Sequence, residues 1–145
     1  MRAVVLATLL GLIVIGMAGC KKDTSENESK ALLALGEGAT TYFQEEHPDA
    51  VDPMKVTTRV YPVAVNPTCV TDGKPASADE ALFTMLRYKG ESGLEVCYQS
   101  KDDGSAFRAW TQVDGKIHLC LQGTNDNGTP KLSTPKEVEG QCEMP

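Results

Sequence analysis

Histidine, tryptophan and basic residues are scarce in this chain of 145 residues, and their scarcity argues against several classes of function. The 14 Lys and Arg residues are outnumbered by 20 Asp and Glu residues, and no basic stripe with interleaved aromatic residues is present. Neutralisation of phosphates by Lys and Arg supplies most non-specific affinity for nucleic acids. The sequence therefore predicts that nucleic acid is not a partner.

Side chains suited to catalysis or metal binding are also few. The two histidines, His47 and His118, lie far apart in the sequence, and no Ser or Cys nucleophile stands in a recognisable frame. No Cys-x-x-Cys pair is present, which argues against redox and zinc sites. Residues 125–128 are similar to the start of a calcium loop but lack its later acidic ligands, so they predict a turn. We expect no enzyme, no catalytic residue, no metal and no cofactor.

One long apolar run is present, at the start of the chain. Arg2 precedes an apolar core from Ala3 to Ile15, and small residues stand before Cys20. The stretch Met17-Ala18-Gly19-Cys20 resembles the lipidation site of bacterial lipoprotein precursors. The resemblance implies that residues 1–19 are a signal peptide and that Cys20 is diacylated and begins the mature chain.

Two other interpretations of this run remain open. A transmembrane anchor needs about 20 apolar residues, for which the run is marginal, and a plain secretory signal would not need a cysteine after its cleavage site. We expect a membrane anchor through lipid on Cys20 and an envelope protein as partner. Lys21 follows where an Asp would resemble an inner-membrane retention signal, which favours the outer membrane.

The mature chain divides into a tether and one domain. Removal of residues 1–19 takes away Arg2 and no acid, which leaves 13 basic and 20 acidic residues and a net charge of −7. Residues 20–30 are polar and predict a flexible, lipidated tether. Residues 31–145 suit a single domain with its own core.

Four cysteines other than Cys20 remain, an even number in an exported chain. We expect them to form two disulfides. The preferred pairing joins Cys69 to Cys97 and Cys120 to Cys142, because each of these bridges ties a loop or tail to a neighbouring strand. The other two pairings remain open.

The first part of the domain predicts an amphipathic helix. A capping-box pattern begins at Ser25, and Pro48 ends the helix by His47. Gly36 and Gly38 indicate either a place where another backbone packs closely or a break. The apolar stripe has helical spacing and consists of Leu32, Leu35, Ala39, Tyr42 and Phe43.

The middle of the chain predicts short elements. Residues 56–65 indicate an edge strand or extended connection because they contain Pro62, and residues 66–76 indicate a loop that carries Cys69. A second capping box at Ser77 predicts a short helix to about Arg87.

The last third predicts antiparallel strands at 93–100, 107–113 and 116–122, followed by a turn-rich tail that Cys142 holds down. A two-residue turn at 114–115 would place polar residues opposite apolar ones. A three-residue loop at 113–115 places Phe107, Ala109 and Thr111 opposite Leu121, Leu119 and Ile117, and we prefer it because one face is then apolar.

The other face of these strands contains a candidate ligand site. In the preferred register it carries Arg108, Trp110, His118 and Cys120. We expect that Trp110, His118 and Arg108 line a small pocket if the protein binds a ligand, although ordinary strand packing is the plainer interpretation of each.

The order of elements resembles type IV pilins and pseudopilins. The segments that carry the resemblance are KALLALGEGATTYFQEEH, PTCVTDGKP, DEALFTMLRY and CYQSKDDGSAFRAWTQVDG. The resemblance implies an α+β domain, with an N-terminal amphipathic helix on a three- to four-stranded antiparallel sheet stapled by disulfides. Prepilins carry a long apolar helix where this chain has a lipidation signal, so the resemblance implies a fold more than a function. We expect a non-catalytic envelope lipoprotein with an interaction or structural role; the alternative is a small-ligand-binding lipoprotein.

Overall fold

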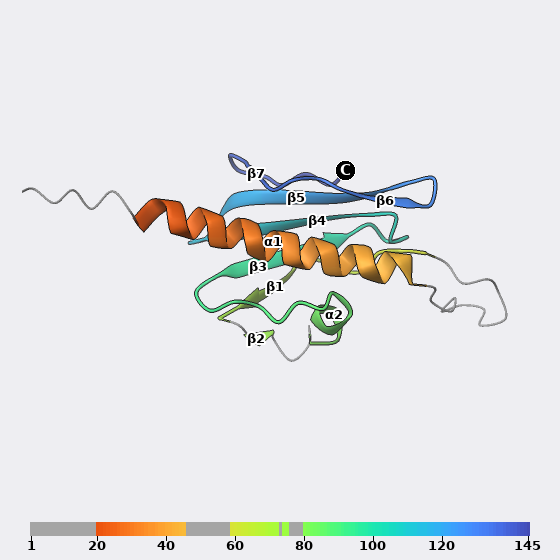
Figure 1. Ribbon diagram of the computed structural model, residues 1–145, viewed down its shortest axis with the longest axis horizontal. Coiled ribbons are helices and arrows are strands. Elements are labelled where there is room, and N and C mark those ends of the chain that lie inside the picture. Colours follow the sequence, from red (N-terminus) through yellow and green to blue (C-terminus); the bar gives the residue numbers. More distant parts are fainter. Residues whose placement is uncertain (1–19, 46–58, 73, 76–79) are drawn as a thin grey trace, which may run out of the picture.

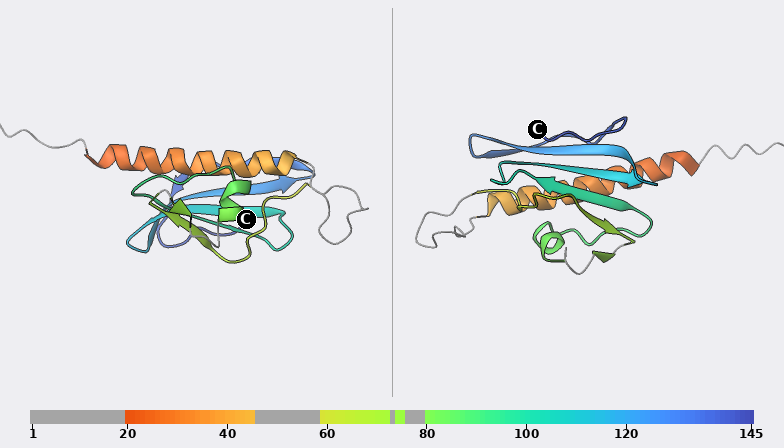
Figure 2. Two further views of the ribbon diagram at one scale, coloured as in Figure 1. Left: turned by 90° about the horizontal axis from the view of Figure 1, so that it is seen from below. Right: turned by 180° about the vertical axis from the view of Figure 1, so that it is seen from behind.

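The computed structural model describes residues 20–45, 59–72, 74–75 and 80–145. One long helix, α1 (Cys20–Gln44), lies across one face of an antiparallel sheet, and Figure 2 shows these two layers. A short helix, α2 (Glu80–Met85), lies beside the C-terminal half of α1 (Figure 1). The predicted α+β class, with an N-terminal helix on an antiparallel sheet and two disulfides, is confirmed.

The sheet is larger than predicted: the described residues form seven strands in place of three or four. The spatial order is β2-β1-β3-β4-β5-β6, and β7 pairs with β5 beyond the end of β6. The strands are β1 (Thr68–Thr71), β2 (Lys74–Pro75), β3 (Glu95–Ser100), β4 (Ala106–Val113), β5 (Lys116–Asp126), β6 (Thr129–Leu132) and β7 (Lys136–Glu137).

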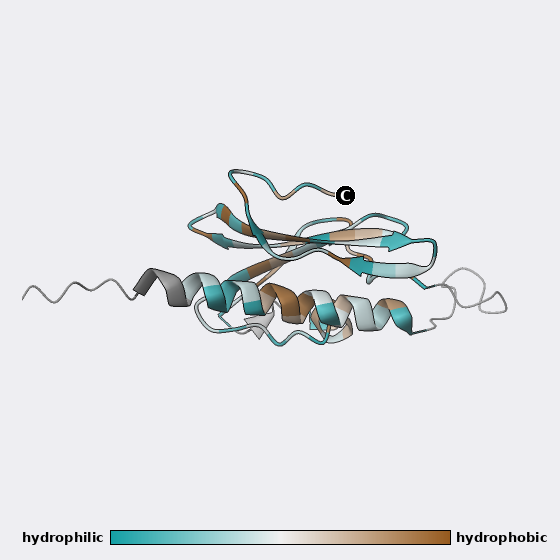
Figure 3. Ribbon diagram, turned by 45° about the horizontal axis from the view of Figure 1, so that its top comes forward, coloured by the Kyte–Doolittle hydropathy of each residue, from teal (hydrophilic) through white to brown (hydrophobic). Residues whose placement is uncertain are grey.

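Helix α1 begins earlier than predicted. Residues 20–30 were expected to form a tether, but α1 is continuous from Cys20, so Ser25 is not its cap. Lys30 and Glu26 form an ion pair one turn apart at 2.7 Å, and Glu28 packs against the sheet. Figure 3 shows the apolar middle of α1 in brown, between more polar turns. The predicted stripe is confirmed: Leu32, Leu35, Ala39 and Phe43 are fully buried, and Tyr42 is half-buried. Ala31 is buried beside them.

Gly38 marks a close contact between α1 and the end of α2, as the sequence suggested. A Cβ atom at Gly38 would lie 1.7 Å from the backbone oxygen of Leu86. At Gly36, by contrast, a Cβ atom would meet only the side-chain ends of Leu132 and Leu121. The two helices approach so closely at Gly38 that only glycine fits there.

An aromatic cluster fills the core between α1 and the sheet. Tyr61 lies between Phe43 of α1 and Phe107 of β4, with ring centroids 4.7 and 4.8 Å away. Tyr98 stacks on Phe107 at 5.1 Å. Both tyrosine hydroxyls donate to backbone oxygens, that of Tyr61 to Thr124 at 2.8 Å and that of Tyr98 to Pro62 at 2.7 Å. The core therefore includes polar groups that are paired within it.

The buried tyrosines make the fold sensitive to alkaline pH. Burial raises the pKa of Tyr61 and of Tyr88 to about 12, and burial raises the pKa of Tyr98 further. Below pH 10 these groups are neutral in both states, whereas above pH 10 only the unfolded chain ionises. The free energy of unfolding should therefore fall steadily from about pH 10 to 12. In an alkaline titration, absorbance at 295 nm and far-UV circular dichroism should change together; full tyrosine ionisation near pH 10 without unfolding would contradict this.

The register of β4 and β5 differs from the one preferred above. Val113 pairs with Lys116 across a two-residue turn, in which Asp114 and Gly115 have φ angles of 51° and 74°, as such hairpin turns require. The prediction of a three-residue loop at 113–115 is therefore wrong. A β-bulge at His118 then shifts the pairing by one residue. Beyond the bulge, Ala109 and Thr111 pair with Leu121 and Leu119, so the apolar face is recovered inside the strand.

Several segments predicted as loops are strands. Cys69 lies in β1, which pairs with β3, and not in a loop. Residues 59–67 form no strand and bend at Val65 and Asn66, which fits a connection and not an edge strand. The tail adds β6 and β7, and the predicted turn lies at Asn127 and Gly128 between β5 and β6, with the Gly128 amide donating to Asn125 Oδ1 at 2.7 Å. His47 and Ser77 lie outside the described residues.

The two disulfides join Cys69 to Cys97 and Cys120 to Cys142, which is the pairing preferred from the sequence. The first links β1 to β3, whose two cysteines are directly opposite in the register. The second ties the tail to β5. Together with Trp110, the buried cysteines Cys97, Cys120 and Cys142 form a second small core on the face of the sheet that α1 does not cover.

Candidate ligand site

The candidate residues Arg108 and Trp110 lie together, but their polar groups are bonded within the fold. The Arg108 guanidinium lies over the Trp110 ring, 5.3 Å from its centroid. It donates to Gln99 Oε1 from Nε at 2.9 Å and from Nη2 at 2.6 Å, and from Nη1 to the Cys142 carbonyl. The Trp110 indole donates to Gln112 Oε1 at 3.1 Å. These two side chains therefore hold the tail against the sheet.

The structure does not bring His118 to Trp110 and Arg108 in one pocket. Strict alternation would place His118 on the face of Cys120, but the bulge turns it toward α1. There His118 Nδ1 lies 3.5 Å from Glu28 Oε1. The expectation of one pocket lined by all three residues is therefore corrected, because the bulge that restores the apolar face also reorients His118.

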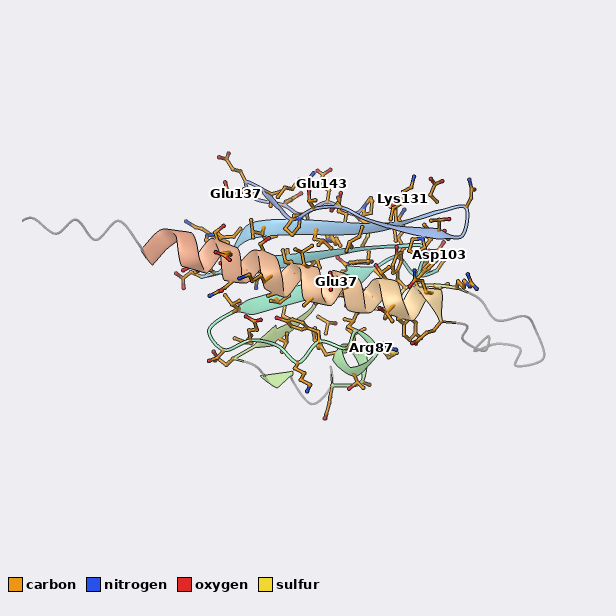
Figure 4. The ribbon with its side chains drawn as sticks, in the orientation of Figure 1. Glu37, Arg87, Asp103, Lys131, Glu137 and Glu143 are labelled. Carbon is orange, nitrogen blue, oxygen red and sulfur yellow. A yellow bond between two sulfur atoms is a disulfide. The ribbon has the colours of Figure 1, made fainter. Side chains whose placement is uncertain are left out.

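A cleft of about 780 Å³ opens beside His118. Its walls come from the first half of α1, from β5 and from the segment that includes β7, and Figure 4 shows Glu137 on that segment. The residues that line it are Thr24, Ser25, Glu28, His118, Leu119, Glu137, Val138 and Glu139. It joins segments that are far apart in the sequence, as binding sites commonly do.

Glu28 is the unusual side chain of this cleft. It is 2% exposed, and its Oε2 lies 3.4 Å from Thr111 Oγ1, at the long limit of a hydrogen bond. Its Oε1 is buried and accepts no hydrogen bond from the described residues, since 3.5 Å to His118 is an ion-pair distance only. A buried carboxylate oxygen without a hydrogen-bond partner is unfavourable, so Glu28 Oε1 is the atom of this cleft that a donor would satisfy.

The cleft is rich in hydrogen-bond acceptors and negative charge. Glu28, Glu137 and Glu139 contribute carboxylates, and Thr24 and Ser25 contribute hydroxyls. Among the described residues of the lining, His118 alone can become a cation, and its side chain is 52% exposed. Leu119 and Val138 add apolar surface. Such a lining suits a ligand with a positively charged donor group and a short apolar part.

Glu28 escaped the sequence prediction because Ser25-x-x-Glu28 was interpreted as a capping box. One signal was available: Glu28 continues the buried stripe by one helical turn, since it precedes Leu32 and Leu35 by four and seven residues. An acidic residue in phase with a buried stripe indicates a buried charge. The opposing residues, Glu137 and Glu139, gave no signal, because they stand in a tail whose path the sequence did not predict.

The cysteine-containing cluster on the other face is not a metal site. Cys69, Glu95 and Cys97 have ligand atoms within 4.8 Å of one another, but the two sulfur atoms are joined to each other. A metal would need thiolates. The Cys20 side chain, the candidate lipidation site, lies outside the described side chains.

Comparisons with protein-family models, with curated proteins and with solved structures found no match for this chain. Across residues 20–45, 59–72, 74–75 and 80–145, no helix is both long enough and apolar enough to cross a membrane.

Proposed function

We propose that this protein is a non-catalytic envelope lipoprotein, held in a bacterial membrane by acyl chains on Cys20, and that its domain contacts another envelope protein. The observation that carries the proposal is Cys20 itself, which follows small residues at the end of the apolar run. Two disulfides support an oxidising compartment. Lys21 after the acylated residue favours the outer membrane.

The start of α1 supports a close attachment of the domain to the bilayer. Because α1 is continuous from Cys20, the anchor and the folded domain are joined by helix and not by a flexible linker. At 1.5 Å per residue, Thr24 lies only about 6 Å along the helix from Cys20. The cleft beside Glu28 would therefore open close to the membrane surface.

A pilin-like arrangement of the domain belongs to the same proposal. Its support is the order of elements: a long N-terminal helix, a disulfide-bearing connection and short helix, and then an antiparallel sheet. In this protein an acyl anchor would stand where a pilin has its filament-forming helix. The domain would be displayed singly and would make its contacts through the sheet and loops.

A second candidate function is the binding of a small ligand. The observation that favours it is the cleft that contains the buried Glu28 carboxylate. A protein that binds a ligand and a protein that captures a partner can share the same anchor. Crosslinking in intact cells separates them, because a contact protein should yield a defined crosslinked partner.

The anchor is tested with Cys20→Ala. We expect the wild-type chain to partition into membranes and its mature N-terminus to carry acyl chains by mass spectrometry, whereas the variant should lose all acyl mass and its membrane association. A single acyl chain alone binds membranes weakly, so partial acylation should be visible as partial release. Lys22→Ala is the control, since it retains Cys20. An unmodified wild-type chain that begins at another residue would contradict the proposal.

A further inference from the structure

We propose that the cleft beside Glu28 binds a small primary alkylammonium ion, with Glu28 as its counter-ion. This inference deepens the second candidate function and does not depend on acylation of Cys20. It rests on two independent observations: a cleft of about 780 Å³, and a carboxylate oxygen in its lining that is buried and accepts no hydrogen bond from the described residues.

The sign of the ligand's charge follows from Glu28. The side chain is 3% exposed, so water cannot compensate its charge as it would at the surface. An ammonium group carries three N–H donors and no acceptor. It would give Glu28 Oε1 the charge-assisted hydrogen bond that it lacks, which is among the stronger polar contacts in proteins.

The other lining groups fit the remainder of such a ligand. The hydroxyls of Thr24 and Ser25 line the same cleft and offer acceptors for the other two N–H groups. Leu119 and Val138 offer apolar contact to a short alkyl chain. An anionic ligand would meet three carboxylates and is excluded by their repulsion.

His118, in the part of the lining that the structure describes, competes with a ligand for Glu28. Its Nδ1 lies 3.5 Å from Glu28 Oε1, beyond a hydrogen bond, and half of its side chain is exposed. The ring is not part of the core, so it can turn toward solvent and open the buried Glu28 Oε1 to a ligand. Glu137 and Glu139 would favour a ligand with a second ammonium group over one with a single charge, because both carboxylates are exposed and lie in the lining.

Isothermal titration calorimetry of the full chain, purified in a non-ionic detergent, tests the proposal. The probes are 1,4-diaminobutane, n-butylamine and 1-butanol at neutral pH. We expect 1,4-diaminobutane to bind more tightly than n-butylamine, and 1-butanol, which has the same size but no charge, to give no heat of binding. Equal binding of 1-butanol, or no binding of either amine, would overturn the proposal.

Variants locate the site. Glu28→Gln should weaken the binding of both amines at least tenfold, and Glu139→Gln should weaken 1,4-diaminobutane two- to threefold. Glu37→Gln makes the same change at an exposed position of α1, labelled in Figure 4, and should leave binding unchanged. Circular dichroism checks that each variant is folded. If Glu28→Gln fails to fold, the comparison of amines with 1-butanol on the wild-type chain still decides the matter. Tight binding that survives in folded Glu28→Gln would overturn the assignment of the counter-ion.

Discussion

Replacing Gly38 with Ala is expected to lower the free energy of unfolding by about 3 kcal/mol. The added methyl group would lie 1.7 Å from the backbone oxygen of Leu86, and a backbone atom at the end of α2 cannot rotate away as a side chain can. Alanine favours the helix by about 1 kcal/mol over glycine, which only partly offsets the displacement of α2. Urea unfolding followed by circular dichroism measures the loss.

Gly36→Ala is the matched control for this prediction. The same substitution, half a turn away on α1, meets the ends of Leu132 and Leu121 at 2.9 to 3.0 Å. These methyl groups can shift by a few tenths of an ångström, so the gain in helix propensity should nearly cancel the strain. Equal losses at Gly36 and Gly38 would mean that the close contact with Leu86 does not limit the packing of α1.

Removing the disulfide between Cys120 and Cys142 should cost about 3 kcal/mol, given the loop that it closes. The variant that tests this carries Cys120→Ser together with Cys142→Ser. We expect the tail to be released from the sheet in this variant. The tail covers Trp110, which is 6% exposed and is the single tryptophan of the chain. Its fluorescence emission should therefore shift to longer wavelength before global unfolding.

The remaining contacts of the tail set the size of this shift. The Gln122 amide donates to the Glu143 carbonyl at 2.7 Å, and the Val138 amide donates to the His118 carbonyl at 3.1 Å. Cys69→Ser with Cys97→Ser is the comparison, because that bridge closes a loop of similar length but does not reach the tail. An unchanged emission in the Cys120 and Cys142 variant would show that hydrogen bonds alone keep the tail in place.

The parts of the fold that were predicted correctly are those in which apolar residues recur with a clear helical or strand period. The stripe from Leu32 to Phe43 has helical spacing, and β3 and β4 lie within two residues of their predicted bounds. The apolar face of Phe107, Ala109 and Thr111 was also predicted correctly. Hydrophobic periodicity reports which face is buried, and in these elements burial decides the conformation.

The parts that the sequence missed depend on contacts between distant segments. Cys69 stands among turn-forming residues, and only its pairing with β3 makes that segment a strand. The strands β6 and β7 form because β5 extends beyond the predicted end and because Cys142 holds the tail. Such pairings leave no periodic signal in a segment of two to four residues.

The candidate site was missed for the same reason. Trp110 and Arg108 were placed correctly on one face, but the sequence did not predict that the C-terminal tail covers these two side chains. Glu28 and His118 meet because a helix extends further than its sequence indicates and because a strand contains a bulge. Both features depend on the assembled domain and not on a local motif.

The bulge at His118 also has a consequence for the length of β5 in this hairpin. β5 contains one residue more than its pairing with β4 requires, since Gln112 pairs with Ile117 and Thr111 with Leu119. A version of the strand without His118 would keep the same two-residue turn and an unbroken ladder. β5 therefore accommodates one residue that its ladder with β4 leaves unpaired, and the effect of that residue is an imidazole ring at the mouth of an acidic cleft.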